Sequence, residues 1–164
     1  MSKIRKTTQY LMPVSRKKPG ALDYDIYPVH DLGDGTVSSD FSELAARIPE
    51  RGTVIVDGYV GVRFDEFVSS LNEALSAVGK TALWWSVDSA LKSPAEIDKM
   101  IEPFLGGDDP LFGYRASLEL KDFFDGDKLA SIKADASAPL NIIYGIGASL
   151  AGWEGTLIYL DIPK

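Results

Sequence analysis

Strand and helix signals alternate along this chain of 164 residues from residue 52 onward, and this alternation constrains the fold more than any other feature. Residues 53–56 (Thr-Val-Ile-Val) are a β-branched run bounded by Gly52, which is typical of a buried strand. Apolar residues recur at helical spacing from 64 to 78, and residues 81–87 predict a second strand. A strand, a helix and a strand in this order form a βαβ unit, whose two strands run parallel.

The rest of the chain continues in the same style with shorter elements. We expect the first long helix to begin with Asp65 as its N-cap and to end before Gly79. Ser93-Pro94-Ala95-Glu96 predicts another helix start with a capping box. The remaining expected elements are one or two short helices within 118–133, broken at Gly126, and strands at 140–144 and 156–161. Together they predict a three-layer α/β fold with a mostly parallel sheet.

Charge is distributed unevenly along the chain. The first 18 residues carry six basic side chains and no acidic one, whereas the remaining residues carry 11 basic and 24 acidic side chains. We therefore expect a basic N-terminal arm and edge strand over residues 1–30, with the strand near 24–27, and an α/β domain over residues 31–164. The arm is expected to fold onto its own acidic domain, with polyanion binding as the less favoured alternative. The acidic body argues against nucleic-acid binding.

Composition excludes several classes of chemistry. The chain has no cysteine, which removes disulfides, thiol catalysis, Fe–S clusters and Cys-based zinc sites. His30 is its single histidine, and no metal site is expected from one imidazole. No apolar run is long enough for a signal peptide or a membrane-spanning helix, so we expect a cytoplasmic protein without a membrane partner.

The loop after the first strand has the order of a phosphate-binding loop but lacks part of its chemistry. Gly58 and Gly61 lie between a strand and a helix, as in GxxxxGK[ST], but the lysine and the hydroxyl are missing and Arg63 is the nearby cation. The glycines either permit a tight turn or help to bind an anion at the helix N-terminus. A complete ATP site is not expected here.

Two further strand ends carry candidate residues, because ligands bind at the carboxyl ends of strands in open α/β sheets. Gly145 and Gly147 match half of a GxGxxG pattern, and Ser149 follows them; the glycines either admit a ligand or form a turn. Asp88 ends a central strand, where a general base or a Mg²⁺ ligand would stand, although an N-cap is equally expected. The predicted phosphate- or nucleotide-binding residues are Gly58, Gly61, Arg63, Gly145, Gly147 and Ser149, with Asp88 as the candidate catalytic residue.

Five blocks of sequence resemble one known family in order along the chain: residues 5–13, 24–28, 55–62, 103–110 and 157–164. They are similar to the N-terminal region of bacterial class I mannose-6-phosphate isomerase-like proteins, over nearly the whole chain. In that family this region precedes a cupin barrel that holds zinc and performs the isomerisation. The resemblance therefore implies that the chain is an N-terminal fragment, that its missing partner is this barrel, and that the isomerase metal site is not in this chain.

The same region resembles P-loop kinases of the uridine kinase and phosphoribulokinase type. Residues 57–63 stand where their phosphate loop would be, and Asp88 falls near their catalytic acid. This second resemblance implies a degenerate P-loop, Rossmann-like fold that keeps a phosphate or sugar-phosphate pocket. Together the two resemblances imply a non-catalytic domain of carbohydrate metabolism that binds a nucleotide or sugar phosphate, with no cofactor of its own and Mg²⁺/ATP as a weaker expectation. The alternatives are an atypical phosphotransferase, with Arg63 as phosphate cation and Asp88 as base, and a structural or oligomerisation module.

Overall fold

The computed structural model describes residues 40–109 and 112–162 of the chain. These residues belong to the second of the two units into which the chain divides, residues 1–37 and residues 38–164. The basic N-terminal arm and the edge strand predicted near 24–27 lie outside the described residues, and so does His30.

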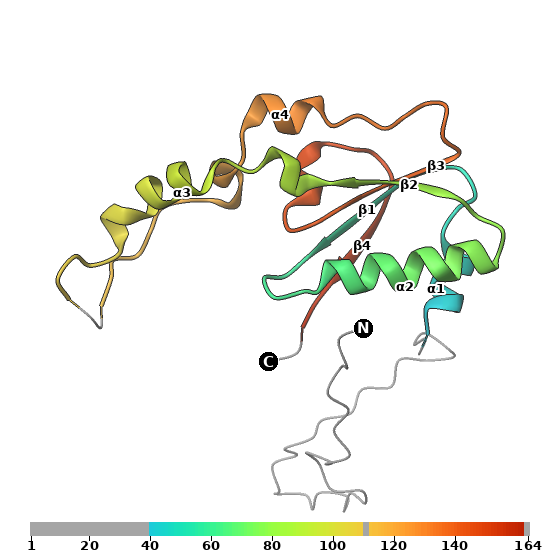
Figure 1. Cartoon of the computed structure of the whole chain (residues 1–164), viewed down its shortest axis with the longest axis horizontal. Coiled ribbons are helices and arrows are strands. Elements are labelled where there is room, and N and C mark those ends of the chain that lie inside the picture. The colour runs from blue at the N-terminus through green and yellow to red at the C-terminus, as the bar shows by residue number, and fades with distance from the viewer. Residues whose placement is uncertain (1–39, 110–111, 163–164) are drawn as a thin grey trace, which may run out of the picture. The chain divides into compact units, whose positions relative to one another are not determined.

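Four parallel strands form one sheet in the spatial order β2-β3-β1-β4 (Figure 1). Their bounds are β1 (Gly52–Gly58), β2 (Ala82–Ser86), β3 (Leu140–Tyr144) and β4 (Thr156–Leu160). All four agree with the predicted strands to within two residues at each end. The strand order requires the chain to cross over β3 between β1 and β2, and to cross back over β1 between β3 and β4.

Helices and short turns of 3-10 helix connect the strands. The α-helices are α1 (Phe41–Arg47), α2 (Phe64–Ala77), α3 (Pro94–Ile101) and α4 (Gly126–Ser131). The 3-10 turns are η1 (Val87–Ala90), η2 (Glu102–Phe104), η3 (Leu120–Phe123) and η4 (Ala148–Ala151). The predicted break at Gly126 is the start of α4, whose N-cap Asp125 accepts hydrogen bonds from the first turn.

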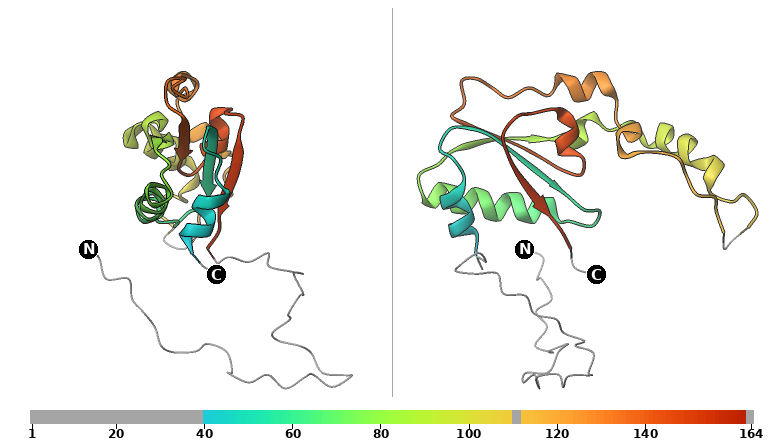
Figure 2. Two further views of the ribbon diagram at one scale, coloured as in Figure 1. Left: turned by 90° about the vertical axis from the view of Figure 1, so that its right-hand side faces the viewer. Right: turned by 180° about the vertical axis from the view of Figure 1, so that it is seen from behind.

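Successive residues of the central strands face opposite sides of the sheet, and this alternation builds two cores. Val54 and Ile142 belong to the core under α1 and α2, together with Leu71 and Leu75 of α2. Their neighbours in sequence, Ile55 and Ile143, belong to the other core. That core is covered by η1, α4 and η4, which contribute Val87, Leu129 and Ala148. Figures 1 and 2 show α2 and α4 on opposite sides of the strands. The three-layer α/β prediction is confirmed.

The adjacent tryptophans of β2 serve both cores, as their alternation predicts. The ring of Trp84 packs edge-on against Tyr144, with 6.0 Å between centroids, on the α2 side of the sheet. The ring of Trp85 packs against Trp153 at 6.4 Å on the other side, and its Nε1 donates to Oδ1 of Asn141. Both residues therefore contribute to packing.

Helix α2 begins earlier than predicted. Its first helical residue is Phe64 and its N-cap is Arg63, so Asp65 lies in the first turn and does not cap the helix. Phe64 packs against Tyr144, with 6.4 Å between ring centroids, and this tertiary contact begins the helix one residue before the expected cap. The predicted C-terminal end is confirmed, because Gly79 follows the C-cap with a φ of 76°.

Helix α1 was not predicted from the sequence, although its signals are local. Asp40 caps it by accepting hydrogen bonds from the backbone N–H groups of Ser42 and Glu43, and its apolar residues follow helical spacing. The helix is short, and Lys80 supports its last turn by donating to the carbonyl oxygens of Ala45, Ala46 and Ile48. A helix of seven residues needs such tertiary support, since short helices are marginal alone.

Candidate functional site

The topology selects one crevice at the carboxyl edge of the sheet. Strands β1 and β3 are neighbours, but β1 leads into α2 on one face of the sheet and β3 leads into η4 on the other. Adjacent strands whose connections leave to opposite faces define a switch point, where open α/β sheets bind their ligands. All six predicted ligand-binding residues lie at the ends of these two strands or in the segments that follow them, with Gly58 as the last residue of β1 and Ser149 within η4.

A buried carboxylate, Asp57, occupies this crevice. The residue is only 8% exposed. Its Oδ1 accepts hydrogen bonds from the backbone N–H groups of Gly58 and Gly147, both at 2.8 Å. Its Oδ2 accepts from the backbone N–H of Ser149 at 3.1 Å and from the Ser149 hydroxyl at 2.5 Å. Asp57 therefore joins the end of β1 to the loop that follows β3.

The surroundings of Asp57 keep its carboxylate ionised. Burial alone would raise the pKa of Asp57, but the hydrogen bonds from Ser149, Gly147 and Gly58 outweigh that effect and hold its pKa below the ordinary value. A carboxylate with four donors satisfies the condition under which a charge can be buried.

Three of the six predicted ligand-binding residues thus already donate hydrogen bonds to a carboxylate of the chain itself. The backbone N–H groups of Gly58, Gly147 and Ser149 all donate to Asp57. Gly145 is a close-packing position, because a Cβ there would lie 2.6 Å from Cγ1 of Val87. The Ala148 N–H donates to the Gly145 carbonyl at 3.1 Å, so Gly145 and Gly147 lie in the tight turn that the sequence left as an alternative to ligand approach.

The other predicted residues on this edge lie at the entry to α2. Gly61 has a φ of 103° within a turn closed by a hydrogen bond from Val62 N–H to the Tyr59 carbonyl. Arg63 is about half exposed and forms an ion pair with Glu66, one turn into the helix. Arg63 is the N-cap of α2, but its side chain accepts no hydrogen bond from the backbone N–H groups of the first turn.

Asp88 lies beside the loop after β3. Its Oδ1 is 3.5 Å from the position that a Cβ on Gly145 would occupy, and the residue is exposed. The N-cap of η1 is Ser86, whose hydroxyl accepts from the Asp88 N–H at 3.2 Å. Asp88 is therefore not the N-cap that the sequence left as an alternative. It does not end a central strand either, as the sequence predicted, because it follows β2, which lies at the edge of the sheet and ends at Ser86. Its carboxylate remains at the same edge as Asp57.

Asp57 organises this edge, although the sequence predicts it only as the first residue of a loop. A carboxylate directly after a buried β-branched run and before a glycine is the local signal that marks it. The structure joins Asp57 to Gly58, Gly147 and Ser149 and places Asp88 beside Gly145. The ion pair of Arg63 is made within its own helix.

The described residues form neither a metal-binding cluster nor a membrane-spanning helix. Over 40–109 and 112–162, no three His, Cys, Asp or Glu side chains gather in a way that could hold a metal ion. None of the helices in that part of the chain is both long and apolar enough to cross a membrane.

A hollow lies at the other edge of the sheet. It is an open depression of about 380 Å³ at the amino ends of β1 and β3, lined by Arg51, Thr53, Asp135, Pro139 and Asn141 among others. Asn141 is buried and holds the loop before it, since its Oδ1 accepts from Asp135 N–H and its Nδ2 donates to the Asp135 carbonyl. The side chain of Asn141 therefore supports the loop before β3.

Comparison with known proteins gives one match. A family model described as a domain of unknown function, DUF8485, matches residues 40–164. No curated protein and no solved structure matches the chain. The matched region begins at Asp40, the N-cap of α1, and so contains the whole described sheet with both cores. Because it covers more than half of the sequence, the chain belongs to the DUF8485 family.

Proposed function

We propose that this chain is a cytoplasmic, non-catalytic domain that binds a nucleotide or sugar phosphate at the carboxyl edge of its sheet, as part of a mannose-6-phosphate isomerase-like protein. The observation that carries the proposal is the entry to α2 at the switch point, where the cap residue Arg63 offers a cation and no side-chain cap covers the first turn. The sequence blocks that resemble the isomerase-like family support the wider assignment.

The α2 entry is suited to a phosphate group. The helix has 14 residues, so its N-terminus carries the partial positive charge and unpaired N–H groups that stabilise anions. The Arg63 guanidinium adds a bidentate donor. Asp65 and Glu66 in the first turn oppose an anion, and Glu66 already pairs with Arg63, so a phosphate must displace that pair. We therefore expect weak binding, with a Kd on the order of 1 mM, about −4 kcal/mol.

The hydrogen bonds that the switch point already makes to Asp57 favour ligand binding over catalysis. A phosphotransferase needs free donors that converge on the transferred group. Here the N–H groups of Gly58, Gly147 and Ser149 donate to Asp57, whose negative charge would also repel a phosphate from that loop. The ligand phosphate is therefore assigned to the α2 side of the crevice.

Isothermal titration calorimetry of the full chain with mannose 6-phosphate, ATP and mannose tests the proposal. We expect heat with at least one phosphorylated ligand, none with mannose, and at least ~10-fold weaker binding for Arg63→Ala, since losing a charged contact costs 1.4 kcal/mol or more. Arg47→Ala is the matched control, because Arg47 is also an exposed arginine ion-paired within its own helix. Equal binding by wild type and Arg63→Ala would contradict the assignment.

The two alternative functions predict different results in the same samples. The phosphotransferase is favoured by the Asp88 carboxylate, which lies at this edge beside Gly145. It predicts phosphate release or transfer from ATP/Mg²⁺ that is lost in Asp88→Asn. The structural module predicts no heat with any of the three ligands.

A further inference from the structure

Residues 93–109 and 112–122, which we call the projecting segment, extend away from both cores of the domain. None of their side chains is buried, and neither core includes any of them. Figure 1 and the right-hand view of Figure 2 show α3 and the chain that follows it reaching beyond the sheet. A stretch of this length without a buried side chain adds little to the stability of the domain.

The base of the projecting segment is firmly attached. An antiparallel bridge pairs Leu91 with Phe124, and the Lys92 N–H donates to the Phe123 carbonyl at 3.0 Å. Lys92 Nζ also donates to the Asp122 carbonyl at 2.6 Å. The segment therefore leaves and re-enters the domain at one place.

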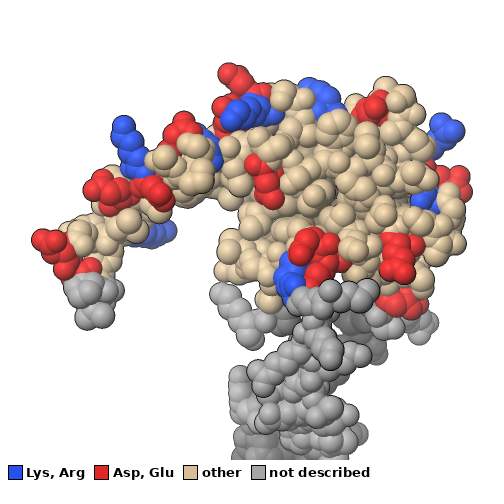
Figure 3. Space-filling view, viewed as in Figure 1, with Lys and Arg blue, Asp and Glu red and all other residues tan. Residues whose placement is uncertain are grey.

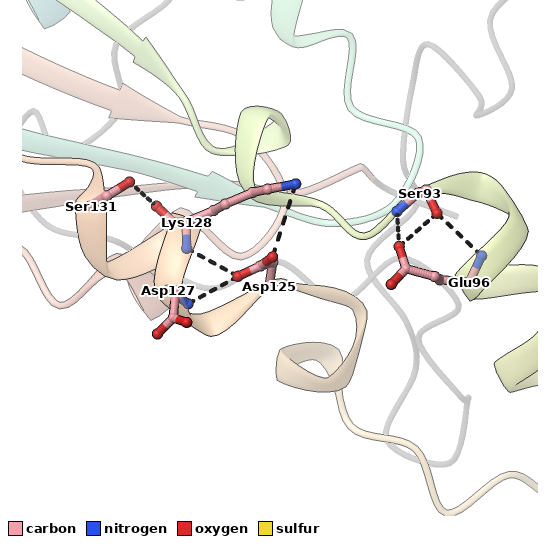
Figure 4. A network of polar contacts seen from close by, with 6 residues as sticks. All are labelled: Ser93, Glu96, Asp125, Asp127, Lys128 and Ser131. Atoms are coloured by element: carbon pink, nitrogen blue, oxygen red, sulfur yellow. Dashed lines mark hydrogen bonds and ion pairs between the residues drawn. The ribbon is translucent and has the colours of Figure 1, made fainter.

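The starts of α3 and α4 are each held by a polar cap, and Figure 4 shows the two caps. Glu96 accepts hydrogen bonds from the backbone and hydroxyl of Ser93, and these lower its pKa. The positive charges of Lys128 and Lys92 lower it further. Lys128 in turn pairs with Asp125, the N-cap of α4.

The outer part of the projecting segment has a defined backbone. The Tyr114 N–H donates to the Phe104 carbonyl at 2.9 Å, and this bond joins the outgoing part of the projecting segment to its returning part. The two glycines beside this bond pack directly on backbone: a Cβ on Gly106 would overlap the Phe112 carbonyl, and one on Gly113 would overlap the Phe104 carbonyl. A backbone that is already ordered loses little conformational entropy when it binds a partner.

Large apolar side chains cover this part of the segment without a partner core. Leu105 is 60% exposed, Phe112 is 72% exposed and Tyr114 is 73% exposed. They continue a stripe of half-buried residues at helical spacing, Ile97, Met100, Ile101 and Phe104. Pre-ordered aromatic side chains on an exposed surface are typical of binding hot spots.

Charge selects the kind of partner. Between residues 93 and 122 there are seven acidic and three basic side chains, a net charge of −4. Figure 3 shows acidic groups along this part of the molecule. Anionic lipid surfaces and nucleic acids would be repelled. A second copy is disfavoured too, because the whole chain carries 24 acidic against 17 basic side chains and so repels its own copies.

We propose that the projecting segment is a docking surface for a protein that presents an apolar face flanked by lysine or arginine side chains. Leu105, Phe112 and Tyr114 enter the apolar face, and the acidic side chains of the segment pair with its basic rim. This inference is independent of phosphate binding at the α2 entry.

Fluorescence anisotropy of a labelled helical Lys/Leu peptide, with leucines at i, i+3 and i+4, tests the docking surface on the full chain. We expect saturable binding that is at least ~10-fold weaker for the double variant Phe112→Ser and Tyr114→Ser, in line with hot-spot losses above 1.4 kcal/mol. The matched control is Leu157→Ser with Tyr159→Ser, an equally apolar pair on β4 that is 58% and 59% exposed. Its affinity should stay within about twofold of wild type.

Peptides of altered chemistry separate this partner from others. A Glu/Leu peptide of the same pattern and a Lys/Ser peptide should both bind at least ~10-fold more weakly, because each lacks one of the two complementary features. Glu102→Lys should weaken Lys/Leu binding, whereas Glu73→Lys on α2 should not. Equal Lys/Leu binding by wild type and the Phe112/Tyr114 variant would overturn the proposal. The proposal would also be overturned if the wild-type chain dimerised or bound phosphatidylserine vesicles and the Phe112/Tyr114 variant did not.

Discussion

At the scale of single residues, Asp57 connects the two halves of the sheet edge. Its carboxylate receives four hydrogen bonds from a residue of its own strand end and from two residues some 90 positions later. No other described carboxylate is both buried and bonded in this way. We infer that the loop after β3 takes its shape from Asp57.

Asp57→Asn is expected to lower the free energy of unfolding at pH 7 by about 2 kcal/mol, because the amide presents a donor where Ser149 needs an acceptor. Urea denaturation measures the change. The control Asp135→Asn removes an exposed carboxylate that also accepts from a serine, Ser137, and should cost less than about 1 kcal/mol.

The comparison of wild type with Asp57→Asn also predicts how the free energy of unfolding depends on pH. The pKa of Asp57 is lowered in the folded state, so its contribution is fully present above the unfolded value near 4 and is lost as pH falls through the folded value. The stability difference between wild type and Asp57→Asn should therefore shrink below about pH 4. A difference that stays constant from pH 7 to pH 3 would contradict the role given to the carboxylate.

At the scale of elements, β4 depends on close approach of its entry to β1. A Cβ on Gly155, the residue before β4, would overlap the carbonyl oxygen of Thr53. The Thr53 hydroxyl also donates to the Glu154 carbonyl, which holds the two segments together. Only glycine allows this approach without a shift of backbone.

Gly155→Ala is expected to destabilise the protein by about 2 kcal/mol through this overlap and to speed amide hydrogen exchange in β4. Gly126→Ala is the matched control, because Gly126 starts α4 with open space around it and an ordinary negative φ. Alanine there should be neutral or stabilise by up to about 1 kcal/mol, since it reduces the freedom of the unfolded chain. Equal losses in both variants would contradict the packing argument.

At the scale of the whole domain, the two cores share their strands. Ile142 and Ile143 are consecutive in β3, yet they belong to different cores, and both are fully buried. Neither face of the sheet can lose its packing without disturbing the strands that supply the other. The described domain should therefore unfold in one cooperative step.

Leu71→Ala, in the core under α2, is expected to cost about 3 kcal/mol and to shift the denaturation midpoints of both cores together. Tryptophan fluorescence, with Trp84 in one core and Trp85 and Trp153 in the other, and far-UV circular dichroism should give coincident curves. Leu157→Ala, on the exposed face of β4, should change stability by less than about 1 kcal/mol. Separate transitions for the two probes would show that the cores unfold independently.

Elements whose signals are local could be predicted from the sequence alone. The β-branched runs of β1 and β3 and the capping box of α3 were all readable, because each depends on neighbouring residues. The same alternation predicted two apolar faces and hence the three-layer architecture. Helix α1 was equally local in its signals but short, and it is held by Lys80, a residue more than 30 positions away.

The hydrogen bonds of the glycine loops, in contrast, follow from the strand order. From the sequence, Gly58, Gly147 and Ser149 were ligand candidates, and Asp57 was one loop residue among others. The strand order β2-β3-β1-β4 makes the end of β1 a neighbour of the end of β3, so these N–H groups converge on the chain's own carboxylate. No local pattern encodes that convergence, because it joins residues about 90 positions apart through the register of a parallel sheet.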